Sequence, residues 1–408
     1  MKPTPVYGLW SLPVIVGALG FFVDVYDLLL FGILRKPSLM SLGLSPEAVF
    51  TEGERLISLQ MLGLLIGGII WGVLGDKRGR LSVLFGSILL YSLANIANGF
   101  VQTVDQYAWL RFIAGIGLAG ELGAGITLTS ELLPNEKRGI AAALIASFGI
   151  LGAVTAFGVS RIADWRLCYE IGGGMGLLLL LMRVRVTESG MFEQVIQQAV
   201  PRGDFRMFFT RQERALRYIR CVLIGVPTWF VIGVLVTFSD RFADEFGIAG
   251  VDPATAILFQ YLGLAAGDLT AGLLSNYLRS RKKTLFIFYG IAALGMLLYF
   301  LQGGGTATGM YAICGMMGFG TGFSVVYITM SAEQFGTNLR ASAAVSIPNM
   351  IRGALPLILL VFQGLRTATG SYLAGGAITG VLLMGIAIIA AWGIGETYGK
   401  DLDFVESD

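Results

Sequence analysis

LQMLGLLIGGIIWGVLGDKRGR, residues 59–80, begins as a continuous apolar run and ends in a short charged turn. The apolar part does not alternate with polar residues, as a strand of a membrane β-barrel would. Its length, 59–75, approaches the roughly 20 apolar residues that a helix needs to cross the hydrocarbon core. GVLLMGIAIIAAWGIG (380–395) has the same character near the other end of the chain. Both segments therefore predict transmembrane α-helices.

Composition extends this prediction to the whole chain. Of 408 residues, 55% are hydrophobic and only 14% are charged. A soluble domain could not hide that much apolar surface, so lipid must solvate most of it. The length leaves room for about twelve spans with short connections, and we expect an all-α membrane protein. The predicted spans lie near 11–34, 56–75, 81–102, 107–130, 138–160, 166–183, 218–239, 255–277, 284–301, 308–331, 341–363 and 371–395.

The chain repeats itself at an offset of about 200 residues. SELLPNEKRGIAAA (130–143) is echoed by AEQFGTNLRASAAV (332–345), so that Glu131 and Arg138 correspond to Glu333 and Arg340. Parallel repeats of this kind are typical of transporters with two pseudo-symmetric lobes and a substrate site between them. The expected parts are a six-helix bundle (1–183), a cytoplasmic linker with an interfacial helix (184–217), a second six-helix bundle (218–395) and an acidic cytoplasmic tail (396–408).

Basic residues predict the orientation in the membrane. Lys and Arg collect in the loops on the side of both termini, for example around 77–80, 183–220 and 279–283. Because cytoplasmic loops carry an excess of these residues, both termini are expected to face the cytoplasm. We therefore expect a multi-pass protein of the cell membrane, working as a monomer.

Several classes of function find no support in the sequence. A net charge of +2 gives no reason to expect nucleic acid as a partner. The three cysteines lack metal-ligand spacing, and the phosphate-binding pattern GxxxxGK[ST] is missing. The chain has no histidine, so a proton relay would have to use carboxylates or water. We expect no enzyme activity, no metal and no cofactor, with the proton as the coupling ion.

The segment GFFVDVYDLLLFG (20–32) carries two acidic residues in the first predicted span. Asp24 and Asp27 are three residues apart, so both project from one helical face. Two carboxylates crowded in a poorly hydrated cavity cannot easily both ionise, so at least one should hold a proton. We interpret the pair as a proton-coupling device. The alternative is a pair at a helix end that faces water in a loop.

Four further ionisable side chains fall inside predicted spans: Arg111, Glu121, Asp268 and Arg352. Such groups are costly in a membrane and usually face a cavity. Arg352 is a natural clamp for a carboxylate or phosphate, but it is equally a candidate partner for Asp268 or for the pair in the first span. Together with Asp24 and Asp27, the predicted spans then contain four carboxylates and only two arginines. The two carboxylates in excess must be protonated or bind cations.

Aromatic residues near these charges complete the candidate site. Tyr26 lies between the two acids of the first span, and Trp229 and Tyr327 lie in the seventh and tenth spans. They are candidates to line the cavity, with close helix packing as the alternative for Trp229 and for Tyr327. Pro227 and Gly233 would permit the seventh helix to bend.

The turn GVLGDKRGR (72–80) matches the loop 2–3 signature of the major facilitator superfamily at every position. This resemblance covers essentially the whole chain and implies the fold of that family. It also implies that the turn is a gate that latches the two lobes and opens during transport. Together with the repeat, it suggests as gating residues Gly72, Asp76, Arg78, Gly79, Arg80, Glu131, Arg138, Glu333 and Arg340. In the second copy, GLLSNYLRSRKK (272–283), Asn276 replaces the aspartate, so we expect a weaker latch.

Two spans resemble particular branches of this superfamily. RFIAGIGLAGELGAG (111–125) carries its arginine–glycine pattern, and the Gly120–Glu121 step is similar to the sugar-porter, metabolite–proton and phosphate–proton branches. The first span resembles that of the phosphate–proton symporters. The second loop motif and the short central loop depart from the sugar-porter pattern, which argues against a sugar as substrate.

The leading hypothesis is a secondary active transporter that works by alternating access. It would be a proton symporter of a small polar or anionic metabolite, such as phosphate or an organic anion. Asp24, Asp27 and Glu121 would carry the proton, and the substrate would contact Arg352, Asp268, Tyr26, Trp229, Tyr327 and Arg111. Two alternatives remain: a proton antiporter or carrier for an organic cation or metal ion, and a transport-inactive sensor on the same fold.

Overall fold

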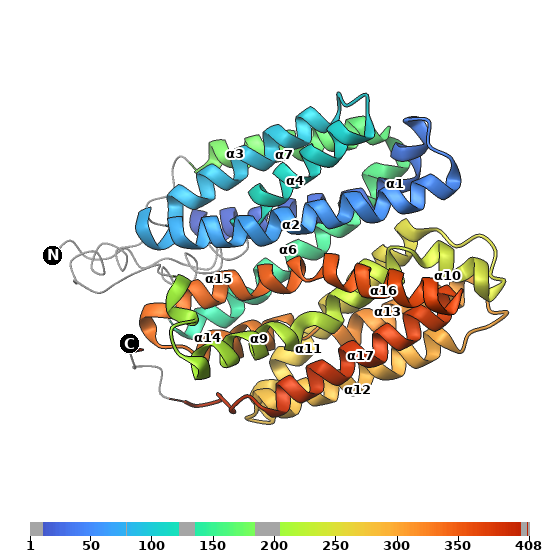
Figure 1. Ribbon diagram of the computed structural model, residues 1–408. Coiled ribbons are helices and arrows are strands. Elements are labelled where there is room, and N and C mark those ends of the chain that lie inside the picture. The colour runs from blue at the N-terminus through green and yellow to red at the C-terminus, as the bar shows by residue number, and fades with distance from the viewer. Residues whose placement is uncertain (1–10, 79, 122–134, 184–204, 401–405, 407–408) are drawn as a thin grey trace. The chain divides into compact units, whose positions relative to one another are not determined.

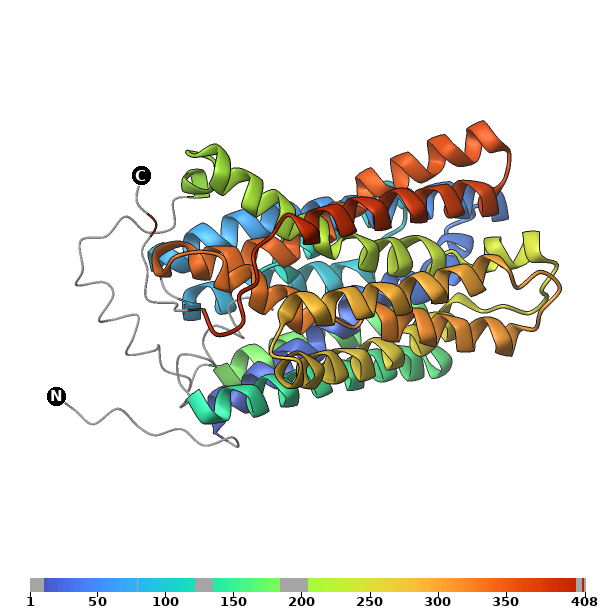
Figure 2. The ribbon, with the colours of Figure 1, turned by 90° about the horizontal axis from the view of Figure 1, so that it is seen from below.

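The computed structural model describes residues 11–78, 80–121, 135–183, 205–400 and 406, and every regular element in these ranges is a helix. The chain divides into two compact units. The N-terminal unit holds residues 1–31 and 35–207, and the C-terminal unit holds 32–34 and 208–408. Within each unit the long helices run side by side along one general direction (Figures 1 and 2).

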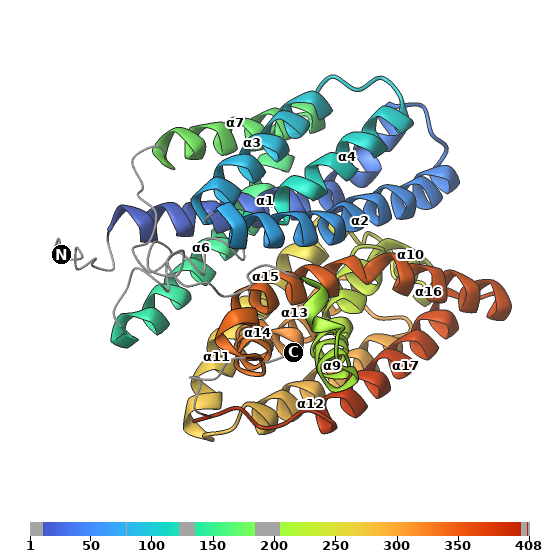
Figure 3. The same ribbon diagram turned by 60° about the vertical axis from the view of Figure 1, so that its left-hand side comes forward.

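The N-terminal unit contains six described helices. α2 packs along α4, and α3 packs on both α4 and α7 (Figure 3). Their bounds are α1 (Leu12–Ser41), α2 (Pro46–Arg78), α3 (Arg80–Asn98), α4 (Val104–Leu118), α6 (Asn135–Ile162) and α7 (Trp165–Arg183).

The C-terminal unit repeats this plan with more interruptions. α11 packs along α13, α12 along α13, and α17 along both α9 and α16. The short η1 (Phe205–Phe208) lies at the division between the units. The elements after it are α9 (Gln212–Phe230), the π-helical turn η2 (Val231–Val236), α10 (Ser239–Phe246), α11 (Pro253–Tyr277), α12 (Arg281–Phe300), α13 (Ala307–Thr321), α14 (Ser324–Glu333), α15 (Thr337–Gly353), α16 (Leu355–Thr369) and α17 (Tyr372–Trp392).

Each of the twelve predicted spans overlaps a described helix, and residues 122–130 of the fourth span lie outside the described residues. Among the described residues, nine helices are long and apolar enough to cross a membrane, and Ser82–Asn98 and Phe148–Ile162 are shorter apolar helices. The seventh, tenth and eleventh spans are each divided into two elements. In the seventh, the π-helical turn begins four residues after Pro227, and π-helical turns of this kind often mark functional sites.

Two described helices differ from the predicted spans at their ends. α1 extends to Ser41, so Arg35, placed in a loop by sequence, lies inside this helix and is buried. Within 205–217 there is no separate interfacial helix, because these residues form η1 and then the first turns of α9. The rest of the predicted linker, up to residue 204, lies outside the described residues.

Glycines at matching positions bring two helix pairs together. Gly63 and Gly67 of α2 lie against the backbone of α4, where a Cβ atom would meet backbone atoms of Phe112 and Ile116. Gly263 and Gly267, 200 positions later, lie in the same way against the backbone of α13. Helices in membranes associate through such small residues because backbones can then approach closely. The sequence repeat is thus also a repeat of helix packing.

Candidate functional site

The acidic residues of α1 lie inside the N-terminal unit. Asp24 and Asp27 are both fully buried, and Asp27 Oδ1 is 3.7 Å from Arg111 Nη1 on α4. Arg111 is also fully buried, and its Nη2 donates a hydrogen bond to Asn95 Oδ1 on α3. Three helices therefore meet around one carboxylate–guanidinium pair. The sequence singled out both charged residues but gave no signal for Asn95.

A second buried ion pair occupies the same unit. Arg183, the last residue of α7, donates to both oxygens of Glu121, at 2.8 and 2.7 Å. Ser87 Oγ donates to the same carboxylate at 3.2 Å, and both charged residues are buried. Arg183 follows the last apolar residue of its predicted span, and this position predicts a loop residue. That assignment was wrong, and the surplus of buried carboxylates is smaller than predicted.

Tyr26 has a packing contact that accounts for its hydroxyl. It is fully buried in α1 and donates a hydrogen bond to the carbonyl oxygen of Cys168 on α7, at 2.9 Å. The ring also fills the space beside Gly172, where a Cβ atom would meet Tyr26 Cε1 at 2.9 Å. Tyr26 therefore joins α1 to α7. Its predicted role as a substrate ligand stays a prediction.

The C-terminal unit places a cation beside an aromatic ring. Arg352 of α15 and Trp229 of α9 are both buried, and Arg352 Cζ lies 5.9 Å from the centroid of the indole ring. A guanidinium near an aromatic face can bind a planar anion, because the charge recognises a carboxylate while the ring contacts the apolar part. Tyr327 is buried in α14, in the same unit.

Asp268 occupies a backbone site at the break in the tenth span. Its Oδ1 accepts hydrogen bonds from the amides of Ser324 and Val325, at 2.6 and 3.3 Å. These amides begin α14, two residues after α13 ends, and a carboxylate is the favoured partner for the free amides of a helix N-terminus. Asp268 therefore holds the start of the half-helix that carries Tyr327.

The glycines of α4 and α13 serve packing. A Cβ atom on Gly115 would meet the carbonyl oxygen of Gln60, and one on Gly117 would meet the backbone of Tyr91. Gly318 of α13 lies against Gln260 in the same way. These contacts explain the glycine-rich motif of the fourth span by close helix approach.

Comparison with known proteins decides the family. Residues 17–358 match the family model described as Major Facilitator Superfamily. The chain belongs to the major facilitator superfamily. Members of this family are membrane transporters, so the prediction of a multi-pass transporter rather than an enzyme is confirmed.

Relatives of this transporter extend over nearly its whole length. It is 27% identical to the niacin transporter NiaP of Acinetobacter baylyi, over 96% of this chain and 95% of the relative. It is 28% identical to the 3-(3-hydroxy-phenyl)propionate transporter of Escherichia coli, over 82% and 83%. The structure of a D-xylose–proton symporter superposes with a TM-score of 0.71 at 18% identity, covering 95% of this chain and 99% of the symporter. This last likeness confirms the fold.

The first predicted gating motif of this transporter is described only in part. Arg78 is exposed, and a Cβ atom on Gly72 would meet no atom within 4 Å, so Gly72 makes no close helix contact here. Glu131 and Gly79 lie outside the described residues. The same holds for the side chains of Asp76, Arg80 and Arg138.

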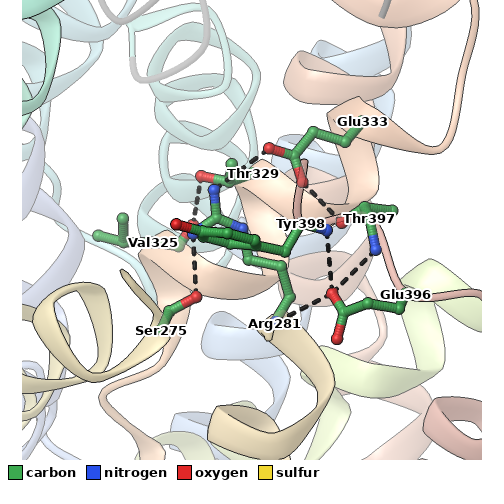
Figure 4. A network of polar contacts seen from close by, with 8 residues as sticks. All are labelled: Ser275, Arg281, Val325, Thr329, Glu333, Glu396, Thr397 and Tyr398. Atoms are coloured by element: carbon green, nitrogen blue, oxygen red, sulfur yellow. Dashed lines mark hydrogen bonds and ion pairs between the residues drawn. The ribbon is translucent and has the colours of Figure 1, made fainter. Parts of the chain in front are cut away.

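The second predicted gating region of this transporter takes part in a polar network, drawn in Figure 4. Arg281, at the start of α12, pairs with Glu333 at 3.3 Å, donates to Ser275 Oγ at 2.9 Å and lies over the ring of Tyr398. Thr397 Oγ1 donates to the other oxygen of Glu333 at 2.6 Å. The predicted gating residue Glu333 thus binds α12 and the segment after α17. Arg340 lies near the start of α15.

Glu396 of this transporter caps α12 from the tail that follows α17. Its carboxylate accepts hydrogen bonds from Ser280 Oγ and from the amides of Arg281 and Lys282, at 3.0 and 3.2 Å for the amides. Partial burial raises the pKa of Glu396. The hydrogen bonds from Ser280 and from the amides of Tyr398, Arg281 and Lys282 outweigh it and lower the pKa to about 2. The tail predicted to be a cytoplasmic appendage is therefore bound to the helix ends.

Replacing Glu396 with Gln should lower the melting temperature of the purified transporter at neutral pH by about 2–4 °C, the effect of losing one helix cap. Because folding lowers the pKa from 4.5 to about 2, the charge stabilises the fold fully above pH 4.5. This contribution to stability is lost as the pH falls from 4.5 to about 2. Thermal melting at neutral pH and at about pH 3 measures it. The difference in melting temperature between Glu396→Gln and wild type should be smaller at about pH 3 than at neutral pH. Asp244→Asn, a change at an exposed carboxylate, should melt like wild type at both pH values.

Proposed function

We propose that this transporter imports a small organic carboxylate together with a proton. The observation that carries the proposal is the buried pair of Asp27 and Arg111, joined across α1 and α4. An ionisable carboxylate in the middle of a span is a functional residue by default, because burying it only for packing would be costly. With an arginine at this distance, the carboxylate can be neutralised either by its partner or by a proton.

Contacts in the C-terminal unit and the names of two relatives support a substrate class. Arg352 supplies a guanidinium for an anionic group, and Trp229 supplies an adjacent aromatic face. Niacin and 3-(3-hydroxyphenyl)propionate are both aromatic rings that carry a carboxylate. We therefore propose an aromatic monocarboxylate as the substrate, rather than phosphate or a sugar.

The charge balance argues against a cation as the substrate. Glu121, predicted to carry part of a carboxylate surplus, is fully engaged by Arg183 and Ser87. Asp268 is engaged by the backbone of α14. Fewer carboxylates are then left to bind a cation or a second proton, and Glu121 is better explained as a structural partner. We propose Asp27, with Asp24 beside it on the same face of α1, as the coupling group.

Uptake by the purified protein in proteoliposomes tests this proposal. With an inward proton gradient, radiolabelled benzoate or nicotinate should accumulate above the level in protein-free vesicles, which corrects for passive entry of the neutral acid. Collapse of the gradient with a protonophore should abolish the excess. Phosphate, xylose and benzylamine should not compete. Accumulation of an amine, or uptake that ignores the gradient, would contradict the proposal.

A further inference from the structure

We infer that Asn95 and Tyr169 hold Arg111 back from direct contact with Asp27, so that this carboxylate stays able to exchange a proton. The inference rests on the proposed coupling role of Asp27. Neither residue is charged, so neither stands out in the sequence. Tyr169 acts on Asp27 through Arg111, whereas Asn95 bonds Arg111 and also interacts with Asp27 itself, and neither residue needs to touch the substrate.

The separation between Asp27 and Arg111 is the first observation. Their nearest atoms are 3.7 Å apart, whereas a hydrogen-bonded arginine–carboxylate pair typically closes to about 2.7–2.9 Å. The same unit offers a direct comparison. Arg183 and Glu121, which are also buried, close to 2.8 and 2.7 Å through two parallel hydrogen bonds. Burial alone therefore does not keep an arginine and a carboxylate apart in this unit.

Two contacts draw the Arg111 guanidinium elsewhere. Its Nη2 donates to Asn95 Oδ1 on α3, and its Cζ lies 4.7 Å from the ring centroid of Tyr169 on α7. A cation is attracted to an aromatic face more strongly when both are desolvated, as they are here. Together these contacts compete with closure onto Asp27.

The ring of Tyr169 is itself fixed in place. Its hydroxyl lies 2.6 Å from the hydroxyl of Tyr107 on α4, and Tyr107 Oη donates to Ser38 Oγ on α1 at 3.4 Å. Tyr107 and Trp165 pack against the Tyr169 ring at near-perpendicular angles. Tyr107 and Tyr169 are fully buried. The platform under Arg111 is therefore tied to three helices and cannot easily follow the guanidinium towards Asp27.

Besides Arg111 and Tyr169, the charged and titratable groups around Asp27 are Asp24 and Tyr26 on α1, Tyr91 on α3, Tyr107 on α4, and the closed pair of Glu121 and Arg183, which neutralise each other. Of these, Tyr107 loses its hydroxyl partner when Tyr169 is replaced by Leu or by Phe. A change in the proton affinity of Asp27 that occurs in Tyr169→Leu and not in Tyr169→Phe therefore reports the position of Arg111.

The chemical consequence of this separation is a moderate proton affinity at Asp27. A closed, doubly hydrogen-bonded pair would favour the ionised carboxylate so strongly that protonation would require very acidic conditions. An arginine with no anchoring could close in that way. Held at 3.7 Å, the Arg111 guanidinium compensates the charge of the buried Asp27 carboxylate without a hydrogen bond to it. A proton can therefore still bind to Asp27.

The test is the pH profile of carboxylate uptake by Tyr169→Leu and Asn95→Leu in proteoliposomes. Each substitution removes one contact that restrains Arg111, so Arg111 should close onto Asp27. The pH of half-maximal uptake should then move about one unit to the acid side, which corresponds to a tenfold loss of proton affinity. Tyr169→Phe keeps the ring under Arg111 and should retain the wild-type profile. Tyr299→Leu, which removes a buried tyrosine bonded to the backbone of Leu235, is the matched control.

The outcomes separate the inference from the proposed function. An unchanged or alkaline-shifted profile in both Leu variants would overturn the inference while wild-type uptake remains proton-driven. A wild type whose uptake ignores pH would instead overturn the coupling role of Asp27. Substrate counterflow at fixed pH and thermal melting check that each variant is folded. Should Tyr169→Leu fail to fold, Tyr169→Met, which also removes the aromatic ring under Arg111, takes its place.

Discussion

Replacing Asp27 with Asn abolishes proton-driven accumulation and leaves exchange of substrate intact; this is the largest effect we expect. Asn has nearly the same shape as Asp and can still accept from Arg111, so packing around the pair should survive. It cannot take up a proton. A pH gradient of one unit, worth about 1.4 kcal/mol, should therefore concentrate substrate about tenfold in wild type and not at all in the variant.

Radiolabel accumulation and counterflow, measured on the same proteoliposomes, separate coupling from folding. Asp244→Asn serves as the matched control, because this carboxylate is 74% exposed and pairs with Arg241 only at 3.9 Å. It should accumulate substrate like wild type. Normal gradient-driven accumulation by Asp27→Asn would remove Asp27 from the coupling role.

Arg352→Ala should weaken substrate binding about 10- to 150-fold with little effect on folding. A hydrogen bond to a charged group contributes about 1.5–3 kcal/mol, and each 1.4 kcal/mol changes affinity tenfold. Arg352→Lys keeps the charge but loses the planar fork, so its affinity should fall in between. Trp229→Phe should lose less than Trp229→Ala, because a phenyl ring still covers the apolar part of the substrate.

Thermal shifts with benzoate and nicotinate measure this binding directly, since a ligand stabilises the folded protein by mass action. The stabilisation should disappear in Arg352→Ala and persist in Arg241→Ala, which removes an arginine from α10. An equal ligand-induced shift in wild type and Arg352→Ala would show that Arg352 does not bind the carboxylate.

The fold could be predicted from sequence because each membrane-spanning helix is determined mainly by the hydropathy of its own segment. Apolar runs of spanning length indicate helices in any membrane protein, and the repeat at an offset of about 200 residues reveals two halves. The matching glycines at 63 and 263 show that the repeat extends to helix packing. The breaks within the seventh, tenth and eleventh spans were not predicted, although Pro227 signalled the first of them. Hydropathy does not change at a break, because both halves remain apolar.

The site could be predicted only as a set of charged residues, without their partners. Asp27, Arg111 and Arg352 stand out because ionisable groups are rare in spans. Pairing depends on helix rotation and packing, which residue type does not encode. Arg183 therefore looked like a loop residue, although it closes onto Glu121. Asp268 looked like a cavity acid, although it caps α14. Asn95 and Tyr169, as uncharged residues, gave no signal at all.

The central claim is that a carboxylate substrate and a proton cross the membrane together, with Asp27 carrying the proton. Its most direct test is the pH outside proteoliposomes, followed with a dye when benzoate or nicotinate is added without a pre-set gradient. After subtraction of protein-free vesicles, wild type should make the outside more alkaline as substrate enters, and Asp27→Asn should give no signal while counterflow continues. The same alkalinisation by Asp27→Asn, or none by an actively exchanging wild type, would contradict the claim.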